Sequence, residues 1–306
     1  MSQNAPIEFR AGFVAVMGRP NVGKSTLINA LIGQKIAAVS PKPQTTRRQQ
    51  LGIYTEDTAQ IVFVDTPGLH NPHHKLGKYM NEEAADALGE ADLILFVVDL
   101  SQMPPHEEDR ILLQLLDGMD AVPKVILALN KIDRVDAGDV ASRASAYGEL
   151  LPDAEICQIS AVRGIGLDQL LDRLTSHLPE APPYYPPDQI TNLYMREIAA
   201  DLIRATCLIH LQDEVPHAIA VRIDEYTERT DSHTYIGATL FVERDSQKGI
   251  VVGKDGKMIK RIGAHARSQI EAMTGGSIYL QLRAKVRPNW RNSEQELSLF
   301  GFQRPE

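Results

Sequence analysis

Residues 18–25 have the types and the spacing of a phosphate-binding loop. Gly18 and Gly23, followed by Lys24 and Ser25, fit the pattern GxxxxGK[ST] directly after a short apolar run. Glycines let backbone N–H groups approach a phosphate, the lysine ammonium meets the β- and γ-oxygens, and the hydroxyl binds Mg²⁺. The pattern predicts a nucleoside triphosphate held by Gly18, Arg19, Pro20, Asn21, Val22, Gly23, Lys24, Ser25 and Thr26.

A second motif for the phosphate side ends another apolar run. Asp65, Thr66, Pro67 and Gly68 follow residues 61–64. The aspartate can hold Mg²⁺ through water, and the glycine N–H can sense the γ-phosphate. The same four residues can form a plain turn, but the phosphate-binding loop upstream favours the functional interpretation.

The identity of the nucleotide base is predicted from Asn130, Lys131 and Asp133, which follow the apolar residues 125–129. A carboxylate only accepts hydrogen bonds, so it suits the N1–H and N2–H₂ donors of guanine. Adenine offers no matching pair of donors, and the pattern therefore indicates GTP rather than ATP. Ser160 and Ala161, which follow the next apolar run, are expected to contact the base through their backbone.

A first switch loop is predicted between these motifs, at Pro43 to Arg47. One of its threonines, Thr45 or Thr46, should complete the Mg²⁺ shell when the γ-phosphate is present. Spacing does not decide between them, and we slightly favour Thr46. The predicted metal ligands are Ser25, Thr46 and Asp65, and the residues predicted to act in hydrolysis are Lys24, Thr46 and Gly68.

Leu69 stands where many small GTPases carry the glutamine that orients water. Because an apolar side chain cannot polarise a nucleophile, we expect slow intrinsic turnover. Asn21 resembles the asparagine that binds K⁺ in related GTPases, and the alternative is a loop residue that caps the next helix. His70, His73 and His74 favour a solvated switch surface over a metal site.

The C-terminal half has a different chemistry. The net charge of −8 falls entirely on residues 1–181, while Lys248 to Arg291 hold ten basic and two acidic residues. A GxxG loop within this basic tract is typical of a KH-type clamp on single-stranded RNA. We predict RNA contacts from Gly253, Lys254, Asp255, Gly256, Lys257 and Lys260. The alternative is a helix pair with a solvated basic face.

A strand beyond the loop adds Arg283, Lys285 and Arg287, then Trp290 as a ring for stacking. These cations are also predicted to contact RNA. The alternative for this run is an edge strand that charge protects from aggregation.

The elements that must position these residues form two patterns. In the first half, the predicted strands are apolar throughout, which indicates a mostly parallel α/β sheet covered by helices on both faces. These strands are expected at 13–17, 52–55, 61–64, 93–98, 125–129 and 155–159. Helices are expected at 24–32, 107–116 and 167–177. The second half predicts a small α+β domain, with a helix near 189–210, strands at 218–226 and 234–243, two helices around 256–273 and a strand at 277–287.

Five prolines within residues 179–187 predict a stiff linker. We therefore expect a nucleotide domain over 1–178, a linker over 179–188 and an RNA-binding domain over 189–306. Two distant cysteines and the lack of an apolar N-terminal run predict a cytoplasmic protein.

The motifs together resemble the Era family of bacterial ribosome-assembly GTPases, which join a P-loop GTPase domain to a C-terminal type II KH domain. The resemblance covers nearly the whole chain, through GRPNVGKS, PQTTR, DTPG, NKID and SA, then GKDG. It implies GTP and GDP as ligands, Mg²⁺ as cofactor, and binding near the 3′ end of 16S rRNA during assembly of the 30S subunit. It also implies peripheral association with the inner membrane, which no lipid motif supports. We expect a monomer, since no heptad seam is present.

Two other functions share some of these motifs. A tRNA-modifying enzyme with a similar GTPase domain would need an extra cofactor domain and a reactive C-terminal cysteine, and neither cysteine is near the end of this chain. An RNA-binding module with an inactive GTPase half is disfavoured because Lys24, Ser25, Asp65 and Asp133 are all present.

Overall fold

The computed structural model describes residues 9–34, 36–38, 46–67, 74–119, 121–230 and 233–302. The chain divides into two compact units. The first ends at Asn192, and the second begins at Leu193 and also includes the described parts of residues 37–46 and 71–80.

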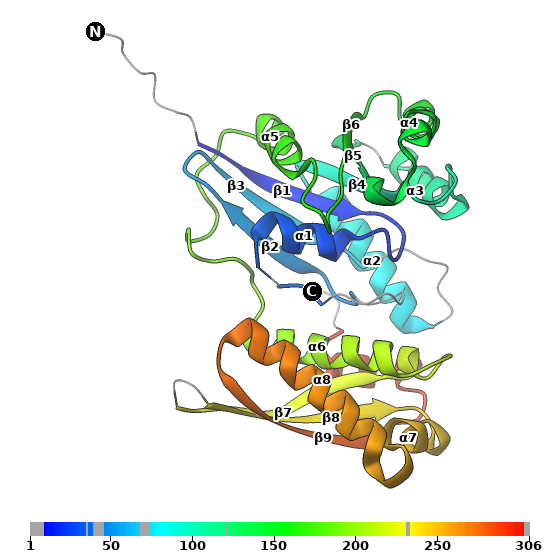
Figure 1. Ribbon diagram of the computed structural model, residues 1–306, viewed down its shortest axis with the longest axis vertical. Coiled ribbons are helices and arrows are strands. Elements are labelled where there is room, and N and C mark those ends of the chain that lie inside the picture. Colours follow the sequence, from blue (N-terminus) through cyan, green and yellow to red (C-terminus); the bar gives the residue numbers. More distant parts are fainter. Residues whose placement is uncertain are drawn as a thin grey trace. The chain divides into compact units, whose positions relative to one another are not determined.

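The first unit is built on a six-stranded sheet in the order β2-β3-β1-β4-β5-β6 (Figure 1). Only β2 is antiparallel to its neighbour, so the predicted mostly parallel sheet is confirmed. The strands are β1 (Arg10–Met17), β2 (Gln50–Thr55), β3 (Ala59–Asp65), β4 (Leu93–Asp99), β5 (Lys124–Asn130) and β6 (Glu155–Gln158).

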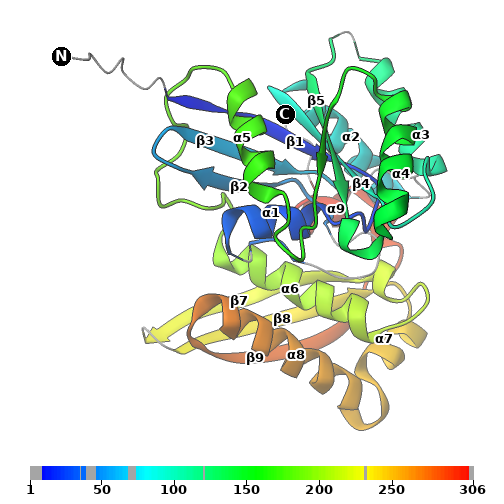
Figure 2. The same cartoon turned by 45° about the horizontal axis from the view of Figure 1, so that its top comes forward.

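Helices cover both faces of this sheet, which explains why its strands are apolar throughout. Along β1, Val14 and Val16 pack with α1 (Lys24–Ile32) and α5 (Leu167–His177), which Figure 2 shows on the same side of the sheet. Their neighbours Ala15 and Met17 pack on the other face. That face is covered by the end of α2 (Lys75–Gly89), by α3 (Glu107–Asp117) and by α4 (Ala137–Leu150).

The polar motifs all follow the carboxyl ends of strands in this sheet. Because parallel strands end at one edge, the loops after β1, β3, β4, β5 and β6 come together there. This topology places the phosphate loop, Asp65, Asn130 and Ser160 in one region, as the sequence predicts.

The proline-rich stretch packs along the first unit rather than standing free. Gln60, a fully buried residue of β3, accepts hydrogen bonds from the backbone N–H groups of Tyr184 (2.7 Å) and Tyr185 (3.0 Å). Its amide nitrogen donates to the Tyr185 carbonyl. Further on, Ile190 and Asn192 accept hydrogen bonds from β2.

These contacts explain a difference from the sequence prediction. The helix expected near 189–210 begins only at Met195, because residues 190–192 run along the edge of β2 instead. The boundary between the two units accordingly falls at residues 192 and 193, beyond the predicted linker.

The second unit has a three-stranded sheet in the order β7-β8-β9, with β7 antiparallel and β9 parallel to β8. Its α-β-β-α-α-β order is the predicted α+β arrangement. The elements are α6 (Met195–His210), β7 (Ala220–Thr230), β8 (His233–Val242), α7 (Asp245–Val252), α8 (Lys257–Thr274), β9 (Ser277–Val286) and α9 (Glu294–Leu299).

Helices α6 and α8 lie on one side of this sheet (Figure 1). Ile236, Ala238 and Leu240 of β8 point toward them into the core. The helix α9, which the sequence did not predict, helps to cover one end of the opposite side at Phe241.

Trp290 corrects a prediction from the sequence. The ring proposed for stacking on RNA is completely buried in the cluster around Phe241 and Phe300, and its indole N–H donates to the Ala218 carbonyl at 2.8 Å. It is a core residue because an indole buries a large apolar surface while its N–H finds a partner.

In the part of the chain that is described, no helix is long and apolar enough to cross a membrane.

We predict that Gln60→Leu lowers the free energy of unfolding by about 1–3 kcal/mol, because the N–H groups of Tyr184 and Tyr185 lose their acceptor. Urea unfolding followed by circular dichroism measures this. The control Gln114→Leu changes an exposed residue of α3 and should shift stability by less than about 0.5 kcal/mol. Equal midpoints for Gln60→Leu and the wild type would contradict the prediction.

Candidate functional site

The loop between β1 and α1 has the backbone that its glycines predict. Gly18 has φ 149°, and a Cβ atom there would lie 2.3 Å from the Val97 carbonyl oxygen. Gly23 has φ 107°, and a Cβ atom there would lie 2.5 Å from the side-chain nitrogen of Asn130. Both positions therefore require glycine, and the loop closes tightly against its neighbours.

Lys24 folds back onto this loop. Its ammonium donates to the carbonyl of Gly18 at 2.7 Å and to that of Arg19 at 3.3 Å. Burial lowers the pKa of Lys24 to about 8, although the Asp65 carboxylate acts in the opposite direction. The group is a buried cation on the glycine-rich loop at the start of α1, which suits a phosphate.

Two of the predicted metal ligands lie together. The Ser25 hydroxyl donates to the Asp65 carboxylate at 2.8 Å. One hydroxyl and one carboxylate oxygen, at the start of α1 and the end of β3, form a hard oxygen pair that fits Mg²⁺. Thr66 faces away from this pair, because its hydroxyl donates to the Val16 carbonyl.

Asn130 joins three loops through one buried amide. Its nitrogen donates to the Val22 carbonyl of the phosphate loop at 2.8 Å. Its oxygen accepts from the backbone N–H groups of Lys131 (2.8 Å) and Ala161 (3.0 Å). The asparagine therefore acts as a scaffold for the site.

Lys131 is held by a residue that belongs to none of the motifs. Its ammonium donates to Asp99, at the end of β4, and to the Asn21 carbonyl, both at 2.7 Å. Burial acts to raise the pKa of Asp99, but hydrogen bonds from Lys131 and Ser101 outweigh it and leave that pKa below its usual value. A carboxylate directly after an apolar strand of the same sheet is the signal that could have identified Asp99.

Asp133 and Ser160 meet at the far end of the same edge. The Ser160 hydroxyl donates to the Asp133 carboxylate at 2.5 Å. This bond orients the carboxylate that is predicted to read guanine. The Ser160 side chain thus takes part in the site, which the sequence did not indicate.

The side chain of Arg19 turns into the protein. It donates to Gln102 at 2.9 Å, and its Nε lies 3.4 Å from the Asp109 carboxylate. Asp109 is fully buried and accepts a hydrogen bond from the Tyr147 hydroxyl at 2.7 Å. Only the backbone of Arg19 is left for a phosphate, and its guanidinium anchors the loop to α3 and α4.

In the second unit, the GxxG loop joins α7 to α8. Gly253 and Gly256 have φ near 70°, and a Cβ atom on Gly253 would lie 2.6 Å from that of Met258. Between them, Asp255 also adopts a left-handed conformation, with φ 55°. The loop turns sharply and exposes three lysines, Lys254, Lys257 and Lys260.

Arg283 and Lys285 do not share the surface of this loop. They alternate along β9 with Leu282 and Ala284, which pack toward α6 and α8. The two cations therefore face the side of the sheet that lacks these helices. Arg287, just beyond the strand, pairs with Glu296 at 3.5 Å.

Comparison with known proteins identifies both units. Residues 13–131 match the family described as 50S ribosome-binding GTPase, and residues 214–291 match the KH domain. A GTPase Era from Geobacter metallireducens is 45% identical over 96% of this chain and 98% of its own length.

The chain belongs to the Era GTPase family. Two solved Era structures have TM-scores of 0.89 and 38% identity, each covering 96% of this chain and 99% of the other. One is a complex with MgGDPNP and nucleotides 1506–1542 of 16S ribosomal RNA. The other, from Aquifex aeolicus, is a variant bound to GDP and AlF₄⁻.

The remaining site predictions are located as follows. Thr45, Gly68, Leu69, His70 and His73 lie outside the described residues. Thr46 is described and belongs to the second unit. The roles assigned to these residues stay predictions.

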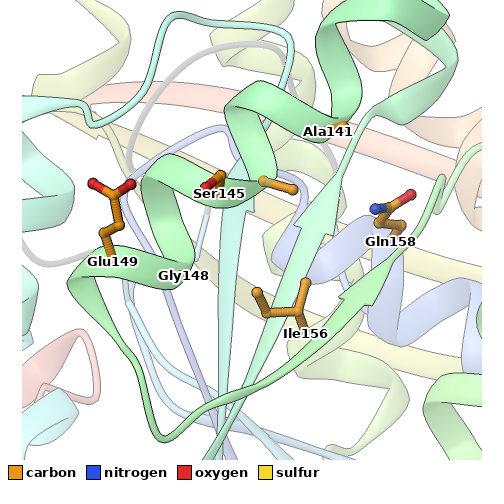
Figure 3. A pocket seen from close by; sticks show the side chains of 7 residues that line it. Ala141, Ser145, Gly148, Glu149, Ile156 and Gln158 are labelled. Atoms are coloured by element: carbon orange, nitrogen blue, oxygen red, sulfur yellow. The ribbon is translucent and has the colours of Figure 1, made fainter.

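A hollow of about 520 Å³ lies elsewhere in the first unit, between α4 and β6 (Figure 3). Small side chains form most of its wall, with Glu149 and Gln158 as the larger polar groups. None of the motif residues lines it, and its shallow, open form brings no reactive groups together. We therefore assign it no role.

We predict that Asp99→Asn weakens GDP and GTP binding about tenfold, because the Lys131 ammonium loses its buried counter-charge. Titration with a fluorescent guanine nucleotide measures the affinity. Asp117→Asn, on the exposed end of α3, is the matched control and should bind normally. Normal affinity in Asp99→Asn would show that Lys131 keeps its position without the ion pair.

We also predict that nucleotide affinity falls by up to about tenfold per pH unit above pH 8, the pKa of Lys24 in the free protein. Below this pH the lysine is already charged. Above it, binding must take up a proton, because a phosphate favours the ammonium form. Calorimetry in buffers of different ionisation heat should detect this uptake at about pH 8.5 and much less at about pH 6.5. Equal proton uptake at both values would rule out this role for Lys24.

Proposed function

We propose that this protein is a GTP-hydrolysing switch that binds the 3′ end of 16S rRNA through its KH domain and assists assembly of the 30S subunit. One observation carries the proposal: a guanine nucleotide site and a GxxG clamp occur in one chain of the Era family. The Era structure with MgGDPNP and nucleotides 1506–1542 supports the choice of RNA.

At the nucleotide site, Mg²⁺ would be held by Ser25 and Asp65, together with Thr46, and would neutralise charge on the phosphates. Around it, the backbone N–H groups of residues 18–26, apart from Pro20, cradle the phosphates. Lys24 leaves the Gly18 carbonyl to meet the β- and γ-oxygens. Asp133, oriented by Ser160, accepts the hydrogen bonds of guanine.

Hydrolysis in this site would be slow without help, since Leu69 offers nothing to orient water. A K⁺ ion bound by Asn21 is the proposed accelerator. Asn21 is exposed and left-handed, with φ 66°, and α1 begins after Gly23 without a side-chain cap, so the asparagine does not serve as the helix cap. We expect GTP turnover to be several-fold faster in K⁺ than in Na⁺. Equal turnover rates in the two ions would rule out the proposed role of K⁺.

The KH unit supplies the RNA clamp. Gly253 and Gly256 let the RNA backbone approach, while Lys254, Lys257 and Lys260 neutralise phosphates beside the start of α8. The proposed location, in keeping with a ribosomal RNA partner, is the cytoplasm. The proposed domain limits are the nucleotide domain over 1–178, the linker over 179–188 and the RNA-binding domain over 189–306.

The test is RNA affinity in two nucleotide states. A single-stranded oligomer with the sequence of the 3′ end of 16S rRNA is titrated with protein bound to GDP or to a non-hydrolysable GTP analogue. We expect tighter RNA binding with the analogue, because the switch loops become ordered only when the γ-phosphate is present and can pass this change on to the KH domain. No binding in either nucleotide state would overturn the assignment of this RNA. Preferential binding to the 50S subunit would mean that the large subunit, and not the 30S subunit, is the partner.

We predict that the double change Lys254→Ala and Lys257→Ala flattens the slope of log K against log salt by about 0.7 for each lost phosphate contact. Both side chains are exposed on the clamp. Arg267→Ala, on the exposed side of α8, removes a positive charge of the same unit and should leave the slope unchanged. An unaltered slope in the double variant would mean that the lysines are only solvated.

A further inference from the structure

The KH sheet has a second face, which α6 and α8 leave uncovered. We call it the open sheet face, and it consists of the outward side chains of β8 and β9 between its covered end and the far turn. Phe241 marks the covered end, where Phe300 and Trp290 pack on it. Beyond it, the outward residues are Thr239, Gly237 and Tyr235 of β8 and Arg283, Gln281 and Tyr279 of β9.

Two aromatic rings are stacked on this face. Tyr235 and Tyr279 are register partners, with centroids 5.7 Å apart and ring planes 15° apart. Tyr279 is 68% exposed although it is a large aromatic residue on a sheet. One flat face of the pair is therefore available to a further ring, and every nucleobase has such a face.

Gly237 makes room for this arrangement. A Cβ atom there would lie 3.3 Å from the Tyr235 hydroxyl oxygen and 3.4 Å from its ring. With glycine, the Tyr235 ring leans across the strand, and its hydroxyl donates to Gln281 at 2.7 Å. This bond fixes the ring against Tyr279 and presents an ordered stacking platform.

Charge is distributed across the face in the way that single-stranded RNA requires. Arg283 and Lys285 are exposed on the edge strand β9, and neither forms an ion pair among the described residues. Carboxylates lie on the opposite strand β7, where Arg222 and Thr239 bind Asp224, while Glu225 is exposed opposite Gly237. Phosphates can follow the cations of β9, while base amino groups can meet the exposed carboxylate of Glu225.

We propose that the open sheet face is a second binding site for single-stranded RNA, with a base stacked on Tyr279 and phosphates at Arg283 and Lys285. The inference rests on the proposed RNA-binding function and extends it. A GxxG clamp holds about four nucleotides, so an RNA as long as nucleotides 1506–1542 of the solved Era complex needs further surfaces. Base stacking on an exposed sheet of a small domain is a known physical solution for this task.

Two RNAs separate the sites. One is a short oligomer of about four nucleotides that fills only the clamp, and the other is a long single strand from the 3′ end of 16S rRNA. Tyr279→Ala should weaken binding of the long RNA about tenfold and leave the short RNA unaffected. Tyr279→Phe, which keeps the ring, should restore the affinity for the long RNA.

Additional variants distinguish the loss of an RNA contact from unfolding of the protein. Arg283→Gln with Lys285→Gln should flatten the salt slope for the long RNA alone, by about 0.7 per contact, while Arg267→Gln on α8 should not. Gly237→Ala should displace the Tyr235 ring and lower the affinity for the long RNA, as Tyr279→Ala does. Circular dichroism and the fluorescence of buried Trp290 report whether each variant is folded.

Photocrosslinking gives a direct reading of the contact. Long RNA carrying 4-thiouridine should attach to the peptide that contains Tyr279, and mass spectrometry identifies that peptide. Wild-type affinity for the long RNA in Tyr279→Ala, without a crosslink to β9, would overturn the second site while the clamp stands. If the wild type binds neither RNA, the proposed function and the second site both fail.

Discussion

The nucleotide site depends on one buried amide, that of Asn130. It is nearly inaccessible, and it must satisfy its donor and acceptor inside the protein. It does so by binding the Val22 carbonyl on one side and the N–H groups of Lys131 and Ala161 on the other. The loops after β1, β5 and β6 therefore have one common reference point, and no two of them can shift independently.

Buried charges surround this reference point at a cost in desolvation. Lys24, Asp65, Asp99 and Asp109 are all less than a tenth exposed. Such groups seldom improve stability over apolar replacements, so their presence is better explained by what they hold in place. Asp99 holds the ammonium that reaches Asn21, and Asp109 holds the guanidinium of Arg19. The first half of the phosphate loop, at Arg19 and Asn21, is thus tied to β4 and α3.

The sequence predicted the parts of this site that follow chain-local rules. A glycine with φ 149° or a carboxylate after an apolar strand leaves a pattern in neighbouring residues, and Gly18, Asp65 and Asn130 were found in this way. Contacts across the fold leave no such pattern. Arg19 was predicted to bind phosphate together with the rest of its loop, and spacing could not reveal that its side chain pairs with Asp109, 90 positions later. Trp290 was misjudged for the same reason, since its burial depends on Ala218 and Phe300.

The two units solve the problem of phosphate binding with the same backbone device and opposite surroundings. In both, glycines with positive φ turn the chain at the start of a helix, and lysines stand beside them. In the nucleotide unit the lysine is buried and the loop is fixed by Asn130, so a ligand must match a rigid set of donors. In the KH unit the lysines are exposed, and charge attracts any phosphate backbone with little demand on its shape. Discrimination there must come from groups that meet the bases, which is why stacking rings and hydrogen-bond acceptors matter more to the RNA unit than additional cations.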